Sequence, residues 1–99
     1  MTASLNWHEV LQNNLPDLMK SVNEIRKCTT SDGALTSETK TLMTLLGDMI
    51  LGHAEGVASI ARQARIDGIS DEAIKETIEV AYLMGGLPAL ITGANAFRN

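Results

Sequence analysis

The 99-residue sequence is poor in aromatic side chains and in cysteine, and both shortages limit the folds and the chemistry that it can support. Its aromatic residues are Trp7, Tyr82 and Phe97, so a core must be built from Leu, Ile, Val, Ala and five methionines. β-Sandwiches normally place aromatic and β-branched residues on their strands, and the composition therefore favours packed helices. The one cysteine, Cys28, excludes an intrachain disulfide and any Cys-x-x-Cys device, as expected in a reducing cytoplasm.

The sequence also lacks basic clusters and an export signal. Eight Lys and Arg are scattered among twelve Asp and Glu, for a net charge of −4, so we expect no nucleic-acid partner. The N-terminus has no basic region followed by an apolar stretch, and we expect no signal peptide and a cytoplasmic protein. Residues 80–97 carry no charge, but the Gly-Gly-Leu-Pro at 85–88 should break a helix. We therefore expect no membrane span, and a helix that other helices and another subunit bury.

Hydrophobic spacing predicts an all-α fold of five or six helices in a single domain, residues 1–99. Apolar residues recur at three- and four-residue steps over 6–27, and Pro16 should divide this region into a short helix and a second that begins near Leu15. Turn-forming residues at 29–34 should end it. Residues 1–34 would thus form an N-terminal helical region and residues 35–97 the core.

Three further helices are predicted by their caps and their apolar faces. Thr36 or Ser37 should cap a helix that ends near residue 51, with Leu42, Leu45, Leu46, Met49 and Ile50 facing inward. Small residues line one face of 53–67, which should let this helix pack closely in the middle of the fold. Gly68 and Ser70 suit a helix C-terminus and the next N-cap. The last helix should bury Ile74, Thr77, Ile78, Ala81, Tyr82 and Met84, break at 85–88, and continue over 90–97.

The stretch 52–88 reads GHAEGVASIARQARIDGISDEAIKETIEVAYLMGGLP. Its helix, glycine cap, second helix and MGG-x-P turn resemble the carboxymuconolactone decarboxylase and AhpD-like alkyl hydroperoxidase superfamily, over about residues 35–97. The resemblance implies an all-α homo-oligomer. In the redox members of that superfamily, a Cys-x-x-Cys at a helix start reduces peroxides or disulfides. A His four residues later and a Glu twelve residues earlier relay protons.

At those redox positions this sequence carries Thr41 for the Glu, His53 for the first Cys, Gly56 for the second and Ile60 for the His. A glycine cannot form a disulfide and an isoleucine cannot carry a proton, so we expect no dithiol chemistry there. The resemblance to the decarboxylase branch, which uses acid–base groups in a pocket between helices, makes His53 the candidate proton-transfer residue.

In that hypothesis Arg62 or Arg65 would hold an anionic substrate, and Asp48 and Glu55 are the nearest carboxylates in sequence. The alternative is that His53 is a surface residue that caps the helix start. No His-x-x-x-His spacing exists, so we expect no metal and no cofactor. Cys28 is predicted to be a small, buried or half-buried apolar residue rather than a single-cysteine peroxidase site.

Three functions remain open from the sequence. The chain could be a non-catalytic or small-molecule-binding homo-oligomer, with a small carboxylated metabolite as the ligand. It could be a non-redox lyase or decarboxylase-like enzyme that uses His53. It could also retain the peroxidase activity of the AhpD-like proteins it resembles.

Overall fold

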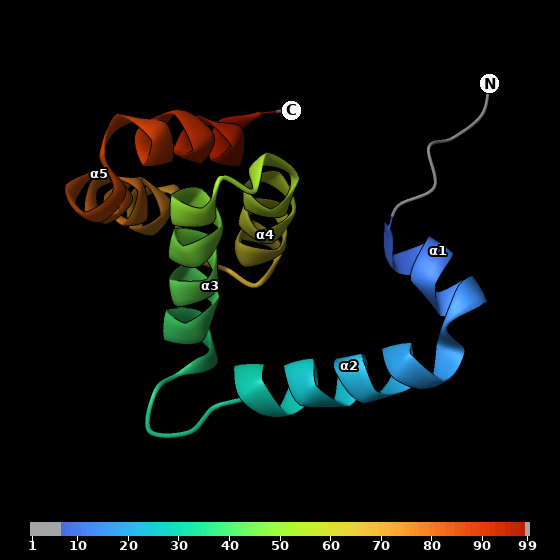
Figure 1. The fold of residues 1–99 in the computed structure, drawn as a ribbon. Coiled ribbons are helices and arrows are strands. Elements are labelled where there is room, and N and C mark those ends of the chain that lie inside the picture. Colours follow the sequence, from blue (N-terminus) through green and yellow to red (C-terminus); the bar gives the residue numbers. More distant parts are fainter. Residues whose placement is uncertain (1–6, 99) are drawn as a thin grey trace. The chain divides into compact units, whose positions relative to one another are not determined.

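The computed structural model describes residues 7–98, and the described residues form helices and no strand, which confirms the all-α prediction. In chain order the elements are α1 (Trp7–Asn14), α2 (Pro16–Thr30), α3 (Ser37–Leu51), α4 (Ala54–Ile66), α5 (Asp71–Gly93) and the 3-10 helix η1 (Ala94–Phe97) (Figure 1). The chain divides between Ser31 and Asp32 into two compact units. The single domain predicted from the sequence has its internal boundary at residue 34.

The N-terminal unit holds α1 and α2, separated at the proline as predicted. Leu15 has an extended φ of −135°, and Pro16 is the first residue of α2 because its missing N–H costs nothing there. The predicted turn at 29–34 begins too early, since α2 continues to Thr30. The hydroxyls of Thr29 and Thr30 donate to the carbonyls of Ile25 and Arg26, four residues back, at 2.7 Å each.

Cys28 is exposed, which corrects the expectation of a buried or half-buried residue. It lies in the last turns of α2, whereas α1 adjoins the opposite end of that helix (Figure 1). Within this unit Met19 is buried, but Leu18 and Ile25 on the same helix are more than half exposed. The periodic apolar face predicted for 6–27 is therefore present but largely uncovered within its own unit.

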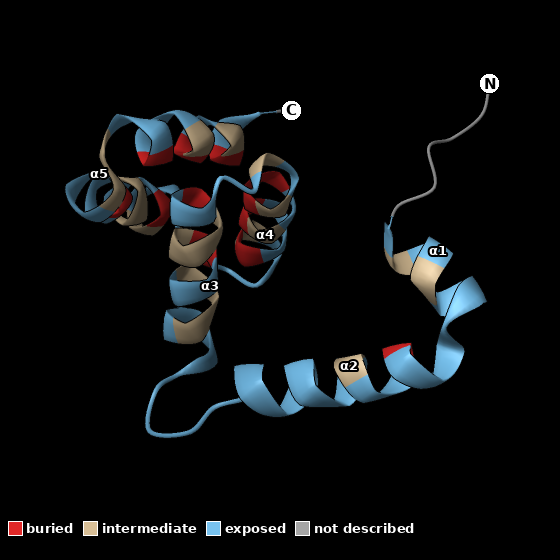
Figure 2. Ribbon diagram, viewed as in Figure 1, coloured by how far each residue is buried: buried red, intermediate tan, exposed pale blue. Residues whose placement is uncertain are grey.

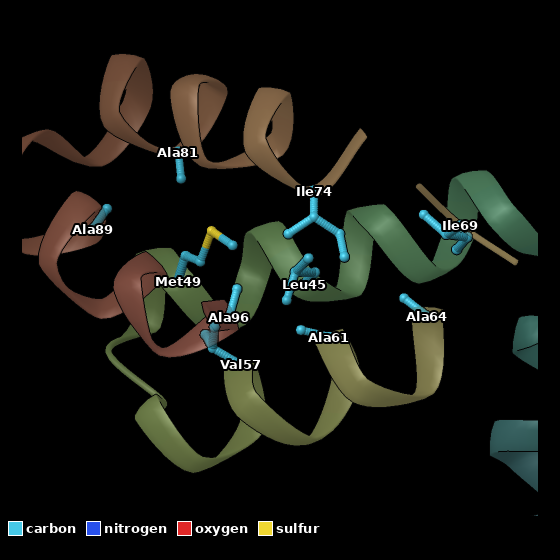
Figure 3. Packing of buried hydrophobic residues seen from close by; sticks show 10 residues of the cluster. All are labelled: Leu45, Met49, Val57, Ala61, Ala64, Ile69, Ile74, Ala81, Ala89 and Ala96. Carbon is cyan, nitrogen blue, oxygen red and sulfur yellow. The ribbon is translucent and has the colours of Figure 1, made fainter. Parts of the chain in front are cut away.

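The small residues predicted to line one face of α4 are buried in the C-terminal unit: Val57, Ala58, Ala61 and Ala64 (Figure 2). Leu45 and Met49 of α3 lie between the alanines of α4 and the inner face of α5 (Figure 3). The alanines allow close approach of the backbones, and the long side chains of α3 fill the space between the helices. The buried cluster comprises Leu45, Met49, Val57, Ala61, Ala64, Ile69, Ile74, Ala81, Ala89 and Ala96.

The predicted helix ends are confirmed by their caps. The Thr36 hydroxyl accepts a hydrogen bond from the Thr39 amide at 3.1 Å, and the Ser70 hydroxyl accepts one from the Ala73 amide at 3.1 Å. Gly68 follows α4 with a φ of +90°, in the left-handed region that favours glycine. Local side-chain chemistry thus fixes where the helices begin and end.

Helix α5 bends at Gly86, whose φ of 72° and ψ of −162° are not helical, two residues before Pro88. The predicted break is therefore confirmed. By length and composition alone, the segment Asp71–Phe97 is long and apolar enough to cross a membrane. The bend interrupts it as a continuous helix.

Three side chains predicted to be buried are exposed: Ile50 at 44%, Tyr82 at 52% and Met84 at 71%. Ile74, Ile78 and Ala81 recur at i, i+4 and i+7, and they form the side of α5 that packs on the core. Tyr82 and Met84 lie outside this face of α5 and are therefore exposed. Ile50 follows Met49, which takes the buried position at the end of α3.

Candidate functional site

The turn between α3 and α4 places His53 at the start of α4. Gly52 ends α3 with a φ of 79°, and the His53 amide then donates to the Asp48 carbonyl at 2.8 Å. His53 is the N-cap residue of α4, but its side chain makes no capping hydrogen bond. The imidazole is thereby left to interact with α3 rather than with its own helix.

His53 pairs with Asp48. Its Nδ1 lies 3.0 Å from the Asp48 Oδ1, with side-chain exposures of 57% for the histidine and 20% for the aspartate. An ionised carboxylate only accepts hydrogen bonds, so Nδ1 donates the proton. When the ring is neutral, Nε2 then carries a lone pair and no proton, which makes it available as a proton acceptor.

Gly56 provides the space for the Asp48 carboxylate. A Cβ at position 56 would lie 2.6 Å from the Asp48 Oδ2 and 2.9 Å from its Cγ, closer than atoms pack. The carboxylate therefore rests against the α4 backbone at this glycine. Two of the four predicted positions, His53 and Gly56, thus meet around Asp48.

The other two predicted positions, Thr41 and Ile60, have structural contacts. The Thr41 hydroxyl donates to the Ser37 carbonyl at 2.9 Å, within α3. Ile60 is partly buried and packs against the core cluster. An apolar side chain thus stands where the redox members carry the proton-relay histidine.

The arginines predicted to hold an anion beside His53 lie at the far end of α4. Arg62 and Arg65 follow His53 by nine and twelve residues, or about 14 and 18 Å along a helix. The Arg65 Nε bonds to the Asp71 Oδ1 at 2.7 Å, and its guanidinium lies 5.0 Å from the centroid of the Phe97 ring. That part of the hypothesis is wrong, because neither side chain spans such a length of helix.

The fold instead brings Arg98 to the start of α4. Its Nη2 lies 2.8 Å from the Glu55 Oε1, across 43 residues of sequence. Sequence reasoning missed this cation because η1 turns the chain end back onto α4, and no local pattern reports that contact. Among residues 7–98, no three His, Cys, Asp or Glu side chains gather as metal ligands would.

Helices α3 to α5 form an all-helical unit in which the His53–Asp48 pair lies at the start of the alanine-rich α4. The model of the carboxymuconolactone decarboxylase family matches residues 16–99, and the chain belongs to that family. The match begins well before residue 35, where the sequence resemblance was placed. It therefore takes in α2 as well as the C-terminal unit.

A solved structure shares the fold. It is the apo form of a carboxymuconolactone decarboxylase family protein from Legionella pneumophila, with a TM-score of 0.83 and 25% sequence identity. The similarity covers 89% of this chain and 79% of that one. No curated protein matches the sequence.

Proposed function

We propose that this chain is a non-redox member of the family that binds a small carboxylated molecule at the His53–Asp48 pair and acts as a cytoplasmic homo-oligomer. The observation that carries the proposal is the 3.0 Å hydrogen bond between the two side chains at the start of α4. A hydrogen-bonded histidine and carboxylate can serve proton transfer and polar recognition without a thiol.

The sulfur content of the chain supports a non-redox role. In peroxide reduction by a dithiol, one thiolate attacks the peroxide and becomes a sulfenic acid. A second thiol then condenses with the sulfenic acid to form a disulfide and release water. The chain has a single cysteine, which lies in α2, and positions 53 and 56 hold histidine and glycine. We therefore expect no dithiol-dependent peroxidase activity.

The electrostatics at the start of α4 support an anionic ligand. The first amides of a helix point away from its body, and its dipole favours negative charge by about 0.3–1 kcal/mol. Arg98 adds a cation at the same helix end, where it pairs with Glu55. A carboxylate bound beside His53 would meet the helix amides, and Asp48 would set the orientation of the ring.

The homo-oligomer is supported by a group of exposed apolar side chains that flank the bend in α5. A Cβ on Gly85 would lie 3.4 Å from the Ile50 Cγ1, so the bend adjoins the end of α3. Soluble proteins seldom leave such groups uncovered, and a second copy is the occupant proposed. This bend surface comprises Ile50, Leu51, Leu83, Met84, Leu87 and Ile91, with exposures between 44% and 78%.

Leu83→Glu is expected to dissociate the oligomer, because it places a charge in the bend surface. Analytical ultracentrifugation should show the wild type as an oligomer at micromolar concentration and the variant as a smaller species. Ile66→Glu is the matched control, since Ile66 is 77% exposed against 78% for Leu83 but lies at the end of α4. A monomeric wild type, or equal dissociation by both variants, would contradict the bend surface as the interface.

Small carboxylates are expected to raise the melting temperature of the wild type but not of His53→Ala. A ligand at about 100 times its Kd stabilises the folded state by roughly 2.7 kcal/mol. For a domain of about 100 residues, that gain in stability raises the melting temperature by roughly 10–20 °C. The thermal-shift panel would hold lactone acids and small di-acids, with quinols and divalent metals as comparison compounds.

His8→Ala, at the other histidine of the chain, is the control and should keep the ligand-induced rise. A panel without any stabilising carboxylate would favour a non-catalytic interaction subunit. A rise that survives in His53→Ala would place the ligand elsewhere.

A lyase or decarboxylase-like activity is the second candidate, and the free Nε2 of His53 favours it. A neutral imidazole whose Nδ1–H is held by a carboxylate can take a proton at Nε2 as a general base. Turnover of a bound lactone acid by the wild type and its loss in His53→Ala would support this candidate.

A further inference from the structure

We propose that Asp48 is the positioning residue of this site. It holds His53 as the Nδ1–H tautomer, with Nε2 as the proton acceptor, and Gly56 is the position that lets the Asp48 carboxylate do so. What His53 then does to a ligand rests on the proposed function. The assignment of its tautomer does not.

Asp48 and His53 are linked by one backbone and one side-chain hydrogen bond. The His53 amide donates to the Asp48 carbonyl at 2.8 Å, and the His53 Nδ1 lies 3.0 Å from the Asp48 Oδ1. The left-handed Gly52 lies between them and closes the turn. The backbone bond sets the position of the histidine Cα, and the side-chain bond sets the rotation of the ring. A ring that is 57% exposed would otherwise turn freely in solvent.

The carboxylate is itself confined. The Asp48 Oδ1 faces the imidazole. The Asp48 Oδ2 lies 2.6 Å from the position that a Cβ on Gly56 would take. The Asp48 side chain is only 20% exposed, so it has little room to leave this position without losing the histidine. Any side chain at position 56 must therefore shift the carboxylate, and we expect this shift to weaken its bond to His53 although the aspartate remains in the chain.

The chemical consequence concerns the exposed nitrogen. With the proton on Nδ1, the neutral ring offers Nε2 only as an acceptor. Such a nitrogen suits a ligand that brings a donor, such as a hydroxyl or an acidic C–H next to a carboxylate. A histidine of the opposite tautomer would present an N–H donor at this nitrogen and could not accept the proton of that ligand.

The tautomer is read directly from the ¹⁵N chemical shifts of the imidazole rings. In ¹⁵N-histidine-labelled wild type, at a pH where the rings are neutral, His53 should be predominantly Nδ1–H. His8 is the second ring and serves as the internal reference. In Asp48→Ala, and equally in Gly56→Ala, the His53 signals should move to those of a mixture of tautomers, while the His8 signals stay unchanged.

Gly47→Ala is the matched control, because a Cβ there meets no atom within 4 Å and the residue adjoins Asp48 on α3. It should keep the wild-type tautomer. Thermal melting of each variant shows that the fold is retained. If His53 were already a mixture or predominantly Nε2–H in the wild type, the proposal would be overturned. It would equally be overturned if Gly56→Ala or Asp48→Ala left the tautomer unchanged.

Carboxylate binding at His53 and the positioning role of Asp48 are contradicted by different results. A wild-type Nδ1–H tautomer that is lost in Asp48→Ala and Gly56→Ala supports the positioning role even if no carboxylate binds. Carboxylate binding that disappears in His53→Ala, with a tautomer indifferent to Asp48, would support the site and overturn the role of Asp48.

Discussion

Leu45→Ala is expected to destabilise the C-terminal unit by about 2–5 kcal/mol, much of the total stability of a small domain. Leu45 is fully buried in the middle of the cluster, between α4 and α5 (Figure 3). Its neighbours include Ala61 and Ala64, whose side chains are too short to fill the cavity left behind. Urea unfolding, followed by circular dichroism, should show a large fall in the midpoint.

Met43→Ala is the control for this prediction. It removes an apolar side chain from the same helix, but Met43 is 54% exposed, so the change in unfolding free energy should be within about 0.5 kcal/mol. Equal losses in the two variants would mean that the core is not centred on Leu45.

Gly86→Ala is expected to cost roughly 1–3 kcal/mol, because φ 72° and ψ −162° form a backbone conformation that is essentially restricted to glycine. This loss of stability comes from the backbone conformation and not from a steric clash of the added methyl group. The nearest atom to a Cβ at this position is the Pro88 Cδ, at an ordinary 3.8 Å. Thermal and urea unfolding should both detect the loss.

The same substitution at Gly47 should have the opposite sign. Gly47 lies inside α3 with open space around it, and alanine is better than glycine in a helix by roughly 0.5–1 kcal/mol. If Gly86→Ala were as stable as Gly47→Ala, the bend in α5 would not depend on the glycine conformation.

The helices were predictable because their signals are local. Thr36 and Ser70 cap through bonds that span three residues, Gly68 ends a helix through its own φ, and the alanine spacing of α4 is visible in the sequence. The errors at Tyr82 and Met84 arise from packing. Apolar residues in a helix indicate that the helix packs against another element. They do not show which side of the helix that element covers.

The site was predictable only in part. The resemblance to the family pointed to His53 and Gly56, and the five-residue spacing to Asp48 is visible in the sequence. Their contact depends on the left-handed turn at Gly52, which rotates the histidine back toward α3. Arg62 and Arg65 were assigned to the site, but they follow His53 by nine and twelve residues along α4. Arg98 was missed because only tertiary structure brings it to Glu55.

The central claim is that a carboxylate binds at His53, and the imidazole spectrum tests it most directly. The chain has two histidines, so a titration of ¹⁵N-histidine-labelled protein with succinate and with a lactone acid reports on His53 against His8 in one sample. Saturable shifts of the His53 ring nitrogens are expected, with no change at His8. Unchanged signals at His53 up to high ligand concentration, or equal shifts at both rings, would contradict it.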